Sequence, residues 1–264
     1  MTKTAYHFEV GKHKLTVFND GKLVDPDNTF DLNCLYIQSG GRKILVDDGC
    51  GENFKGPPGQ AQTDTPNVTP GHLVENMAAE GLRPEDITDI IFTHGHIDHV
   101  SGTFDAIGKA IFPNARYTLN KKEWDYILAG PDDNENLTWL FDPARKHLVN
   151  FKDRVNPVGD NDTVAPGIKL VPAPGHTPGS TMIEISSEGQ KLLCIGDIIH
   201  AYREFAEPEH YAALDYNPAA AVQTRLKTLA KAAQEGTLVF ACHFDFPGLG
   251  HIREKKGVLG WEPI

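Results

Sequence analysis

The chain has 264 residues, 40% of them hydrophobic, and its 25 Lys and Arg against 36 Asp and Glu give a formal net charge of −11. This acidic balance, with no run rich in Lys or Arg, argues against nucleic acid or an anionic membrane as the main partner. No stretch approaches 18 consecutive apolar residues, so we expect no transmembrane helix. The first residues lack the apolar core of a secretory signal, and the four cysteines are scattered through apolar runs. We therefore expect a cytoplasmic protein with buried thiols.

Short alternating or β-branched runs predict strands in both halves of the chain, and helical patterns follow them. In the first half the predicted strands are 14–18, 32–37, 43–46, 87–92 and 117–119. Helices are expected from Thr69-Pro70 to Gly81, over 121–128 and over 137–148. The last third adds strands at 168–171, 181–185, 191–195 and 238–241, and a helix from Asn217-Pro218 to Gly236.

A loop rich in Gly, Pro, Gln and Thr covers residues 51–71, and we expect it to help shape a binding pocket. No linker divides the two halves of the chain. The sequence therefore predicts a single domain, residues 1–264, with two sheets and outer helices.

Metal-binding residue types are concentrated directly after the strand predicted at 87–92. The segment 93–99 reads THGHIDH and holds His94, His96, Asp98 and His99. In extended structure His94 and His96 project to one side, and a turn after them can bring Asp98 and His99 to a neighbouring position. Imidazole and carboxylate ligands together suit zinc, iron or manganese. A solvated polar loop is the alternative interpretation.

Three later strands also end in a polar side chain, namely His176, Asp197 and His243. Strand ends from one sheet edge can converge, although a residue in such a place is often a turn or capping group. Seven candidates are too many for one tetrahedral ion and favour two. One ion would take His94, His96 and His176, the other Asp98, His99 and His243, with Asp197 bridging them.

These motifs, in this order, resemble the metallo-β-lactamase fold superfamily of metallohydrolases. The resemblance rests on H-x-H-x-D-H, the G-H-T-P-G-S turn at 175–180, the Gly196-Asp197 pair and the late His243. It covers about Leu15 to His251 and implies an α/β fold, an αββα sandwich of two mixed β-sheets with outer helices. Val46-Asp47-Asp48-Gly49 resembles the first motif and implies that Asp47 orients metal ligands, with a turn carboxylate as the alternative.

Two segments narrow the resemblance to the methyl parathion hydrolase and acyl-homoserine lactonase branch. They are 242–251, CHFDFPGLGH, and 196–200, GDIIH. The branch implies a dinuclear-metal hydrolase that acts on a neutral lactone or ester through a metal-bridging hydroxide. Zinc is the expected metal, with iron or manganese as alternatives, and the expected partner is a small-molecule substrate. Dimers are common in this branch, so a homodimer is a further expectation.

Asp98 and His200 are the candidate catalytic residues. Either could pass a proton to the departing alkoxide. His200 lies three residues after Asp197, where related lactonases carry a tyrosine; a hydrogen bond to the backbone is its alternative role. Asp245, in the segment after His243, is expected to point to solvent. Four aromatic residues would suit an acyl or aryl group, although such residues are more often core: Phe205, Tyr211, Phe244 and Phe246.

Other activities share this fold. A phosphotriester or aryl ester hydrolase is the second choice, and a thioesterase is disfavoured because only 21 residues follow His243. A mononuclear iron sulfur dioxygenase is the alternative from another class. The seven-residue ligand set speaks against it, because that enzyme needs one iron and an open site.

Overall fold

The computed structural model describes residues 3–24, 29–51, 71–130 and 138–264. Within these ranges, fourteen strands form two sheets of seven. The first sheet has the order β1 (Ala5–Val10), β2 (His13–Val24), β3 (Thr29–Ser39), β4 (Arg42–Val46), β5 (Asp89–Ile91), β6 (Arg116–Asn120) and β7 (Val155–Val158). The second has the order β14 (Val258–Pro263), β13 (Leu249–Lys255), β12 (Leu238–Phe240), β11 (Gln190–Cys194), β10 (Thr181–Ser187), β9 (Ile168–Pro172) and β8 (Thr163–Ala165).

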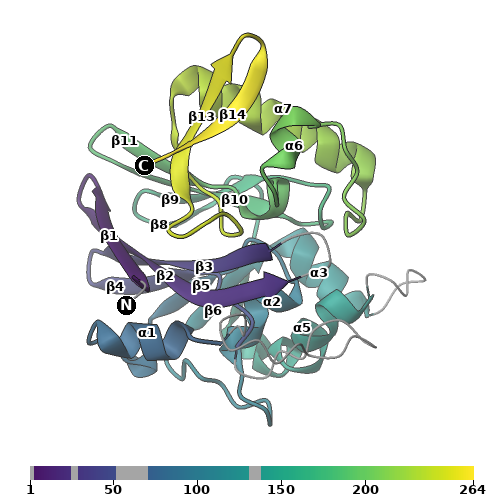
Figure 1. The fold of residues 1–264 in the computed structure, drawn as a ribbon. Helices are drawn as coiled ribbons and strands as arrows, with labels where there is room; N and C mark the ends of the chain where they lie inside the picture. Colours follow the sequence, from purple (N-terminus) through teal and green to yellow (C-terminus); the bar gives the residue numbers. More distant parts are fainter. Residues whose placement is uncertain (1–2, 25–28, 52–70, 131–137) are drawn as a thin grey trace.

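Both sheets are mixed. In the first sheet β1 to β4 pair antiparallel and β4 to β7 pair parallel. In the second sheet β11 and β12 are parallel and the other neighbours are antiparallel. The sheets lie face to face, with helices outside each of them (Figure 1).

The α-helices that the structure describes are α1 (Leu73–Ala79), α2 (Ile97–Val100), α3 (Lys121–Ala129), α5 (Asp142–Lys146), α6 (Arg203–Ala206) and α7 (Pro218–Glu235). Helices α1, α2, α3 and α5 pack on the first sheet, with α1 and α5 below it in Figure 1, and α6 and α7 lie on the side of the second sheet. None of the helices in the described ranges is long and apolar enough to cross a lipid bilayer.

The core consists of three apolar layers. One joins the first sheet to its helices and includes Phe92, Tyr117 and Met77. A second fills the space between the sheets, where Ile37 and Ile183 are fully buried. The third joins the second sheet to α7 and includes Leu229. Three layers between four tiers of elements confirm the expected αββα sandwich.

Two parallel strand pairs bring the candidate site residues together. The carboxyl ends of β4 and β5 share one edge, so Asp47 and the segment 93–99 leave the sheet side by side. The ends of β11 and β12 do the same for Asp197 and His243 in the second sheet. The site therefore lies where these two edges meet.

Several element predictions differ from the structure. The helix predicted over 137–148 is a 3-10 turn, Trp139–Phe141, followed by α5, and position 137 lies outside the described residues. The break falls beside Pro143, which has no N–H to donate and opens a new helix. Helix α1 begins at Leu73 with His72 as its N-cap, and Thr69-Pro70 lies outside the described residues, as does most of the 51–71 loop. Strands β1, β7, β8, β13 and β14 were not predicted.

Candidate metal centre

Local backbone geometry places the four candidates of segment 93–99. Residues 92–96 continue from β5 without forming regular structure, and His96 is the N-cap of α2, with extended backbone angles (φ −72°, ψ 157°). The single turn of α2 then carries Asp98 and His99 back toward His94, whose ring centroid lies 4.0 Å from that of His99. His94, His96 and His99 are each at most 3% exposed.

Asp197 lies at the centre of five imidazoles. Its Oδ2 lies 3.3 Å from Nε2 of His176 and of His200, and 3.7 Å from Nε2 of His94. Its Oδ1 lies 3.2 Å from Nε2 of both His99 and His243. Within the described part of the chain, Nε2 of His94 and of His99 are buried and have no hydrogen-bond partner. One carboxylate cannot satisfy so many converging ring nitrogens, and this donor set fits divalent cations.

The ligand atoms fall into two groups that share Asp197. One group is His94, His96, His176 and Asp197, and the other is His99, Asp197, Cys242 and His243. Within each group the candidate ligand atoms lie within 4.8 Å of one another. Asp98 lies beside the second group, with Oδ2 3.6 Å from Nε2 of His243 and 3.7 Å from Nε2 of His99. All seven predicted ligands are therefore brought together, and Cys242 is an addition that the sequence motifs did not indicate.

Burial and charge divide these groups into neutral and charged ones. Burial lowers the pKa of His94 and His96 well below the usual histidine range. Burial also opposes charge on His99, but Asp197 and the other nearby carboxylates outweigh it and raise that pKa well above its usual value. For Asp197 burial favours the acid, yet the surrounding histidines hold its pKa well below the ordinary range. Asp197 is thus ionised, and the neutral imidazoles carry a free lone pair for a metal ion.

Hydrogen bonds outside the ring of ligands fix the orientation of three histidines. Asp47 accepts from the backbone N–H and the hydroxyl of Thr93, both at 2.8 Å, and its Oδ2 lies 2.9 Å from Nδ1 of His99. Asp215 Oδ1 lies 3.0 Å from Nδ1 of His176. The Asp31 carbonyl lies 3.3 Å from Nδ1 of His243. Such bonds turn Nε2 of each ring toward the centre. The expectation for Asp47 agrees with this geometry, whereas nothing in the sequence around Asp215 indicated its role.

Glu123, in the first turn of α3, ties two ligand-bearing loops together. This carboxylate is fully buried and accepts from Gly95 N at 2.8 Å, from Gly179 N at 2.8 Å and from the Thr177 hydroxyl at 2.8 Å. Gly179 must be glycine, because a Cβ there would lie 2.2 Å from the backbone nitrogen of Glu123. The carboxylate therefore joins the loop of His94 and His96 to the loop of His176.

His200 lies at the edge of the ring. Its side chain is 16% exposed, against 1% for His94. Nε2 lies 3.3 Å from Asp197 Oδ2, and Nδ1 lies 3.6 Å from Glu204 Oε1. Burial opposes its charge, but Asp197 and Glu204 outweigh burial and raise its pKa to about 10. The backbone N–H of His200, not its ring, donates to Glu204, at 2.6 Å.

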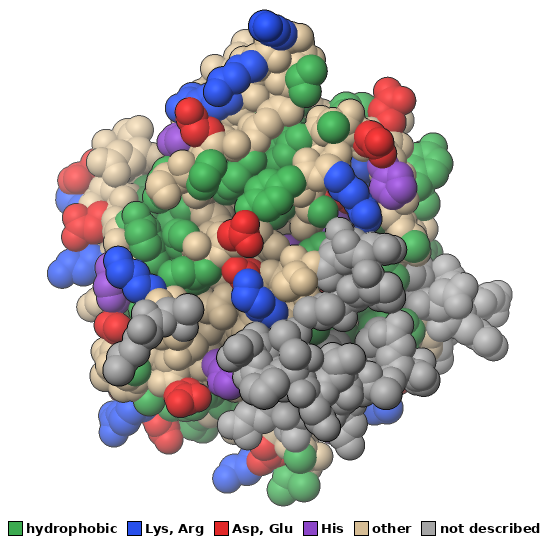
Figure 2. Space-filling model, viewed as in Figure 1, with side chains coloured by type: hydrophobic (Ala, Val, Ile, Leu, Met, Phe, Trp, Pro, Cys, Tyr) green, Lys and Arg blue, Asp and Glu red, His purple; other side chains and the backbone are tan. Residues whose placement is uncertain are grey.

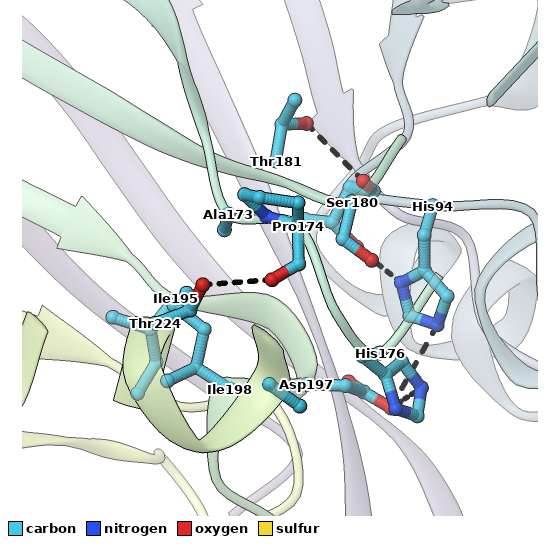
Figure 3. Close-up of a pocket in the computed structure, with 12 residues that line it drawn as sticks. His94, Ala173, Pro174, His176, Ser180, Thr181, Ile195, Asp197, Ile198 and Thr224 are labelled. Atoms are coloured by element: carbon cyan, nitrogen blue, oxygen red, sulfur yellow. Dashed lines mark hydrogen bonds and ion pairs between the residues drawn. The ribbon is translucent and has the colours of Figure 1, made fainter. Parts of the chain in front are cut away.

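A cavity of about 10 Å³ lies on the α7 side of the site, bordered by His94, His176 and Asp197 and by Thr224 of α7 (Figure 3). Its size suits a single water molecule and not a substrate. The side chains of Asp98, at 14%, and of His200, at 16%, are more exposed than those of the buried histidines.

The remaining sequence expectations have mixed outcomes. Asp245 is exposed and accepts from the Tyr202 hydroxyl at 3.2 Å, which agrees with its expected direction. Phe205 and Phe244 belong to the core between the second sheet and α7, so they are not free to line a pocket. Basic and acidic side chains are interspersed on the face in Figure 2, and the described part of that face shows no broad basic surface.

Comparison with known proteins identifies the fold family. Residues 28–243 match the Metallo-beta-lactamase superfamily. The chain belongs to this superfamily. Within it, the N-acyl homoserine lactonase of Bacillus cereus is 26% identical over 266 residues, which cover 97% of this chain and 96% of that protein. The N-acyl homoserine lactonase of a Bacillus sp is 27% identical over 252 residues, covering 91% of this chain and 93% of that protein.

Solved structures of the superfamily superpose on almost the whole chain. AidC, a dizinc quorum-quenching lactonase in complex with a product N-hexnoyl-L-homoserine, has a TM-score of 0.87 at 24% identity and covers 98% of this chain and 97% of its own. The hydrolase AbOPH in beta lactamase superfamily has a TM-score of 0.86 at 25% identity, and the match covers 100% of this chain and 98% of its own. These findings confirm a metal-dependent hydrolase of the metallo-beta-lactamase superfamily and support its lactonase branch.

Proposed function

We propose that this member of the superfamily is a dinuclear-metal hydrolase that opens a neutral lactone or ester, with zinc as its metal. The observation that carries the proposal is the position of Asp197, which is shared by two groups of buried ligand atoms. A mononuclear site would need only one of these groups, so the second supports two ions and disfavours the mononuclear dioxygenase alternative.

The proposed ligands follow the two groups. His94, His96 and His176 would hold one ion, while His99, His243 and Asp98 would hold the other, and Asp197 would contact both. Imidazole and carboxylate donors of this kind are those that zinc prefers. The name of the structural neighbour AidC, a dizinc lactonase, supports zinc by analogy.

Two metal ions, when bound, would lower the pKa of a water molecule toward neutrality and polarise a substrate carbonyl. The chain's own residues supply the remaining functions. Asp47 and Asp215 hold the imidazoles of His99 and His176 in one orientation. Burial of His94 and His96 excludes bulk water from one side of the site, which strengthens every electrostatic interaction there.

His200 and Asp98 are placed to move protons. In the metal-free protein Asp197 and Glu204 raise the pKa of His200 to about 10. Its Nε2 lies at the edge of the site, 3.3 Å from Asp197 Oδ2, and would donate a proton to the oxygen of the departing alkoxide. The Asp98 side chain is 14% exposed, and its Oδ2 would accept a proton from the attacking water. After ring opening, Asp98 carries one proton more and His200 one proton fewer, so the number of protons on the protein is unchanged.

The charge of the chain as a whole favours a neutral substrate over an anionic one. The formal net charge is −11, so an anion would be repelled on approach and a neutral molecule would not. The Bacillus relatives are named for N-acyl homoserine lactones, which are uncharged at the ring and the acyl chain. A lactone with an acyl substituent is therefore the first substrate to try.

A substrate panel with two matched variants tests the proposal. Zinc(II)-loaded protein is assayed on an acyl lactone, an aryl ester, a phosphotriester and a thioester. Lactone turnover should exceed the others, should be lost in Asp197→Asn together with metal, and should survive in the exposed control Asp125→Asn. Full lactone turnover in metal-free Asp197→Asn would refute the proposal, and preference for the phosphotriester would replace its substrate class.

A further inference from the structure

A fully buried arginine lies close to the candidate metal centre, beyond the histidines. Arg225, on α7, is 0% exposed. Its Nε donates to the Ile198 carbonyl at 2.8 Å, and its Nη1 donates to the carbonyls of His210 at 2.7 Å and Pro208 at 3.1 Å. Buried cations require such partners. All three carbonyls belong to the segment that follows Asp197, in which α6 contributes a single short helix. Arg225 therefore anchors a largely irregular segment to a long helix.

Two buried carboxylates flank the remaining nitrogen of this guanidinium. Nη2 lies 3.9 Å from Glu204 Oε1 and 3.9 Å from Asp215 Oδ2. Glu204 is 3% exposed and Asp215 is 5% exposed. Burial raises the pKa of Glu204, but His200 and Arg225 outweigh burial and lower it to about 2, so this carboxylate is charged. A cation between the two carboxylates offsets their mutual repulsion in this water-poor region.

Each of these two carboxylates also contacts one histidine of the site. Asp215 Oδ1 lies 3.0 Å from Nδ1 of His176, a proposed metal ligand. Glu204 accepts from the backbone N–H of His200 at 2.6 Å, and its Oε1 lies 3.6 Å from Nδ1 of the same residue. Two chains of contacts thus start at Arg225. One passes through Asp215 to His176, a proposed metal ligand, and the other passes through Glu204 to His200, the proposed proton donor.

We infer that Arg225 is a positioning residue that holds Asp215 and Glu204 in place, and through them sets the orientation of His176 and His200. Asp215 keeps the His176 ring turned so that Nε2 faces Asp197. Glu204 fixes the backbone and ring of His200 at the edge of the site. Arg225 links the two, so its loss affects both metal retention and turnover, whereas loss of either carboxylate affects one of them.

Zinc release, which is independent of activity, separates these effects. Each protein is loaded with zinc(II), and its release to excess chelator is timed beside kcat and KM on an acyl lactone. Asp215→Asn should release zinc about 10-fold or more faster, as expected for a group that orients a metal ligand. Glu204→Gln should lower kcat about 10-fold or more, with zinc release and KM near wild type.

Arg225→Met should show both defects, and Arg225→Lys should show both in weaker form, because it keeps the charge without the planar fork. Lys227→Met removes an exposed cation from the same helix and should show neither. Wild-type zinc release and kcat in folded Arg225→Met would overturn the inference. So would a loss in Arg225→Met that neither carboxylate variant shares.

If Arg225→Met does not fold, Arg225→Lys and the two carboxylate variants decide. The inference then stands only when Arg225→Lys shifts both readouts and each carboxylate variant shifts its own. The turnover arm rests on the proposed function. Wild-type protein that retains zinc but hydrolyses no lactone would refute that function, and the zinc-release arm would still test the role of Arg225 through Asp215.

Discussion

Glu123→Gln tests how the two ligand loops are held together. The carboxylate accepts from Gly95 N on Oε1 and from Gly179 N on Oε2, and both of these groups can only donate. Glutamine offers one oxygen, so its NH₂ group must face one of the two N–H groups whichever way the amide is turned. The substitution keeps the shape of the side chain and removes one acceptor.

The magnitude follows from the lost contact and its burial. A hydrogen bond to a charged acceptor is worth about 1.5–3 kcal/mol, and a buried N–H left unpaired costs about 1–3 kcal/mol. Burial raises the pKa of Glu123, so the neutral amide recovers part of the cost of burying a charge. We therefore expect the free energy of unfolding at pH 7 to fall by about 2–3 kcal/mol. Because Gly95 lies between His94 and His96, zinc retention should fall as well.

The assay is urea unfolding of the metal-free protein, followed by zinc release to a chelator from the loaded protein. Asp125→Asn is the matched control, since Asp125 lies on the same helix with its side chain 55% exposed and pairs with Lys121. That control should change stability by less than about 0.5 kcal/mol. If Glu123→Gln also stays within about 0.5 kcal/mol and releases zinc at the wild-type rate, the role assigned to this carboxylate is wrong.

Three further predictions concern groups around the ring of histidines. Asp47→Asn should weaken zinc binding about 10- to 100-fold in a competition titration, because His99 loses its orienting carboxylate; unchanged affinity would contradict this. His200→Phe should lower kcat about 100-fold at unchanged zinc content, and loss of zinc there would instead make His200 a ligand. Glu204 has a pKa of about 2 in the folded metal-free protein against 4.5 for the free group, so its stabilisation is present above pH 4.5 and lost as the pH falls toward 2. Relative to Glu204→Gln, that stabilisation should be about 3 kcal/mol at pH 7 and about 2 kcal/mol smaller at pH 3, measured by urea unfolding; a pH-independent difference would contradict it.

The clustering of the proposed ligands could be predicted from the sequence because they lie shortly after apolar strands. His94, Asp197 and His243 are polar groups at the carboxyl ends of strands, and parallel pairing brings such ends to one edge. The two sheets and the helices packed against them were predictable for the same reason, since alternation and helical periodicity are local properties. The local sequence pattern was therefore sufficient to predict the strand ends, the sheets and the helices.

Apart from Asp47, the groups that contact the proposed ligands from outside were not predictable. Glu123, Asp215 and Arg225 lie on helices or in an irregular segment, far in sequence from the histidines they serve. Their roles depend on tertiary contacts between α3, α7 and the loops, which no local pattern encodes. Strands β13 and β14 were also not predicted, and β14 is only partly buried.

Metal content measured together with hydrolysis tests the central claim most directly. Zinc, iron and manganese would be quantified per chain in the purified protein, and acyl-lactone turnover would be followed before chelation, after chelation and after zinc(II) is returned. We expect about two metal ions per chain, with turnover that is lost on chelation and restored by zinc(II). One iron per chain with no lactone or ester hydrolysis would contradict it, and oxidation of sulfur substrates would become the next activity to test.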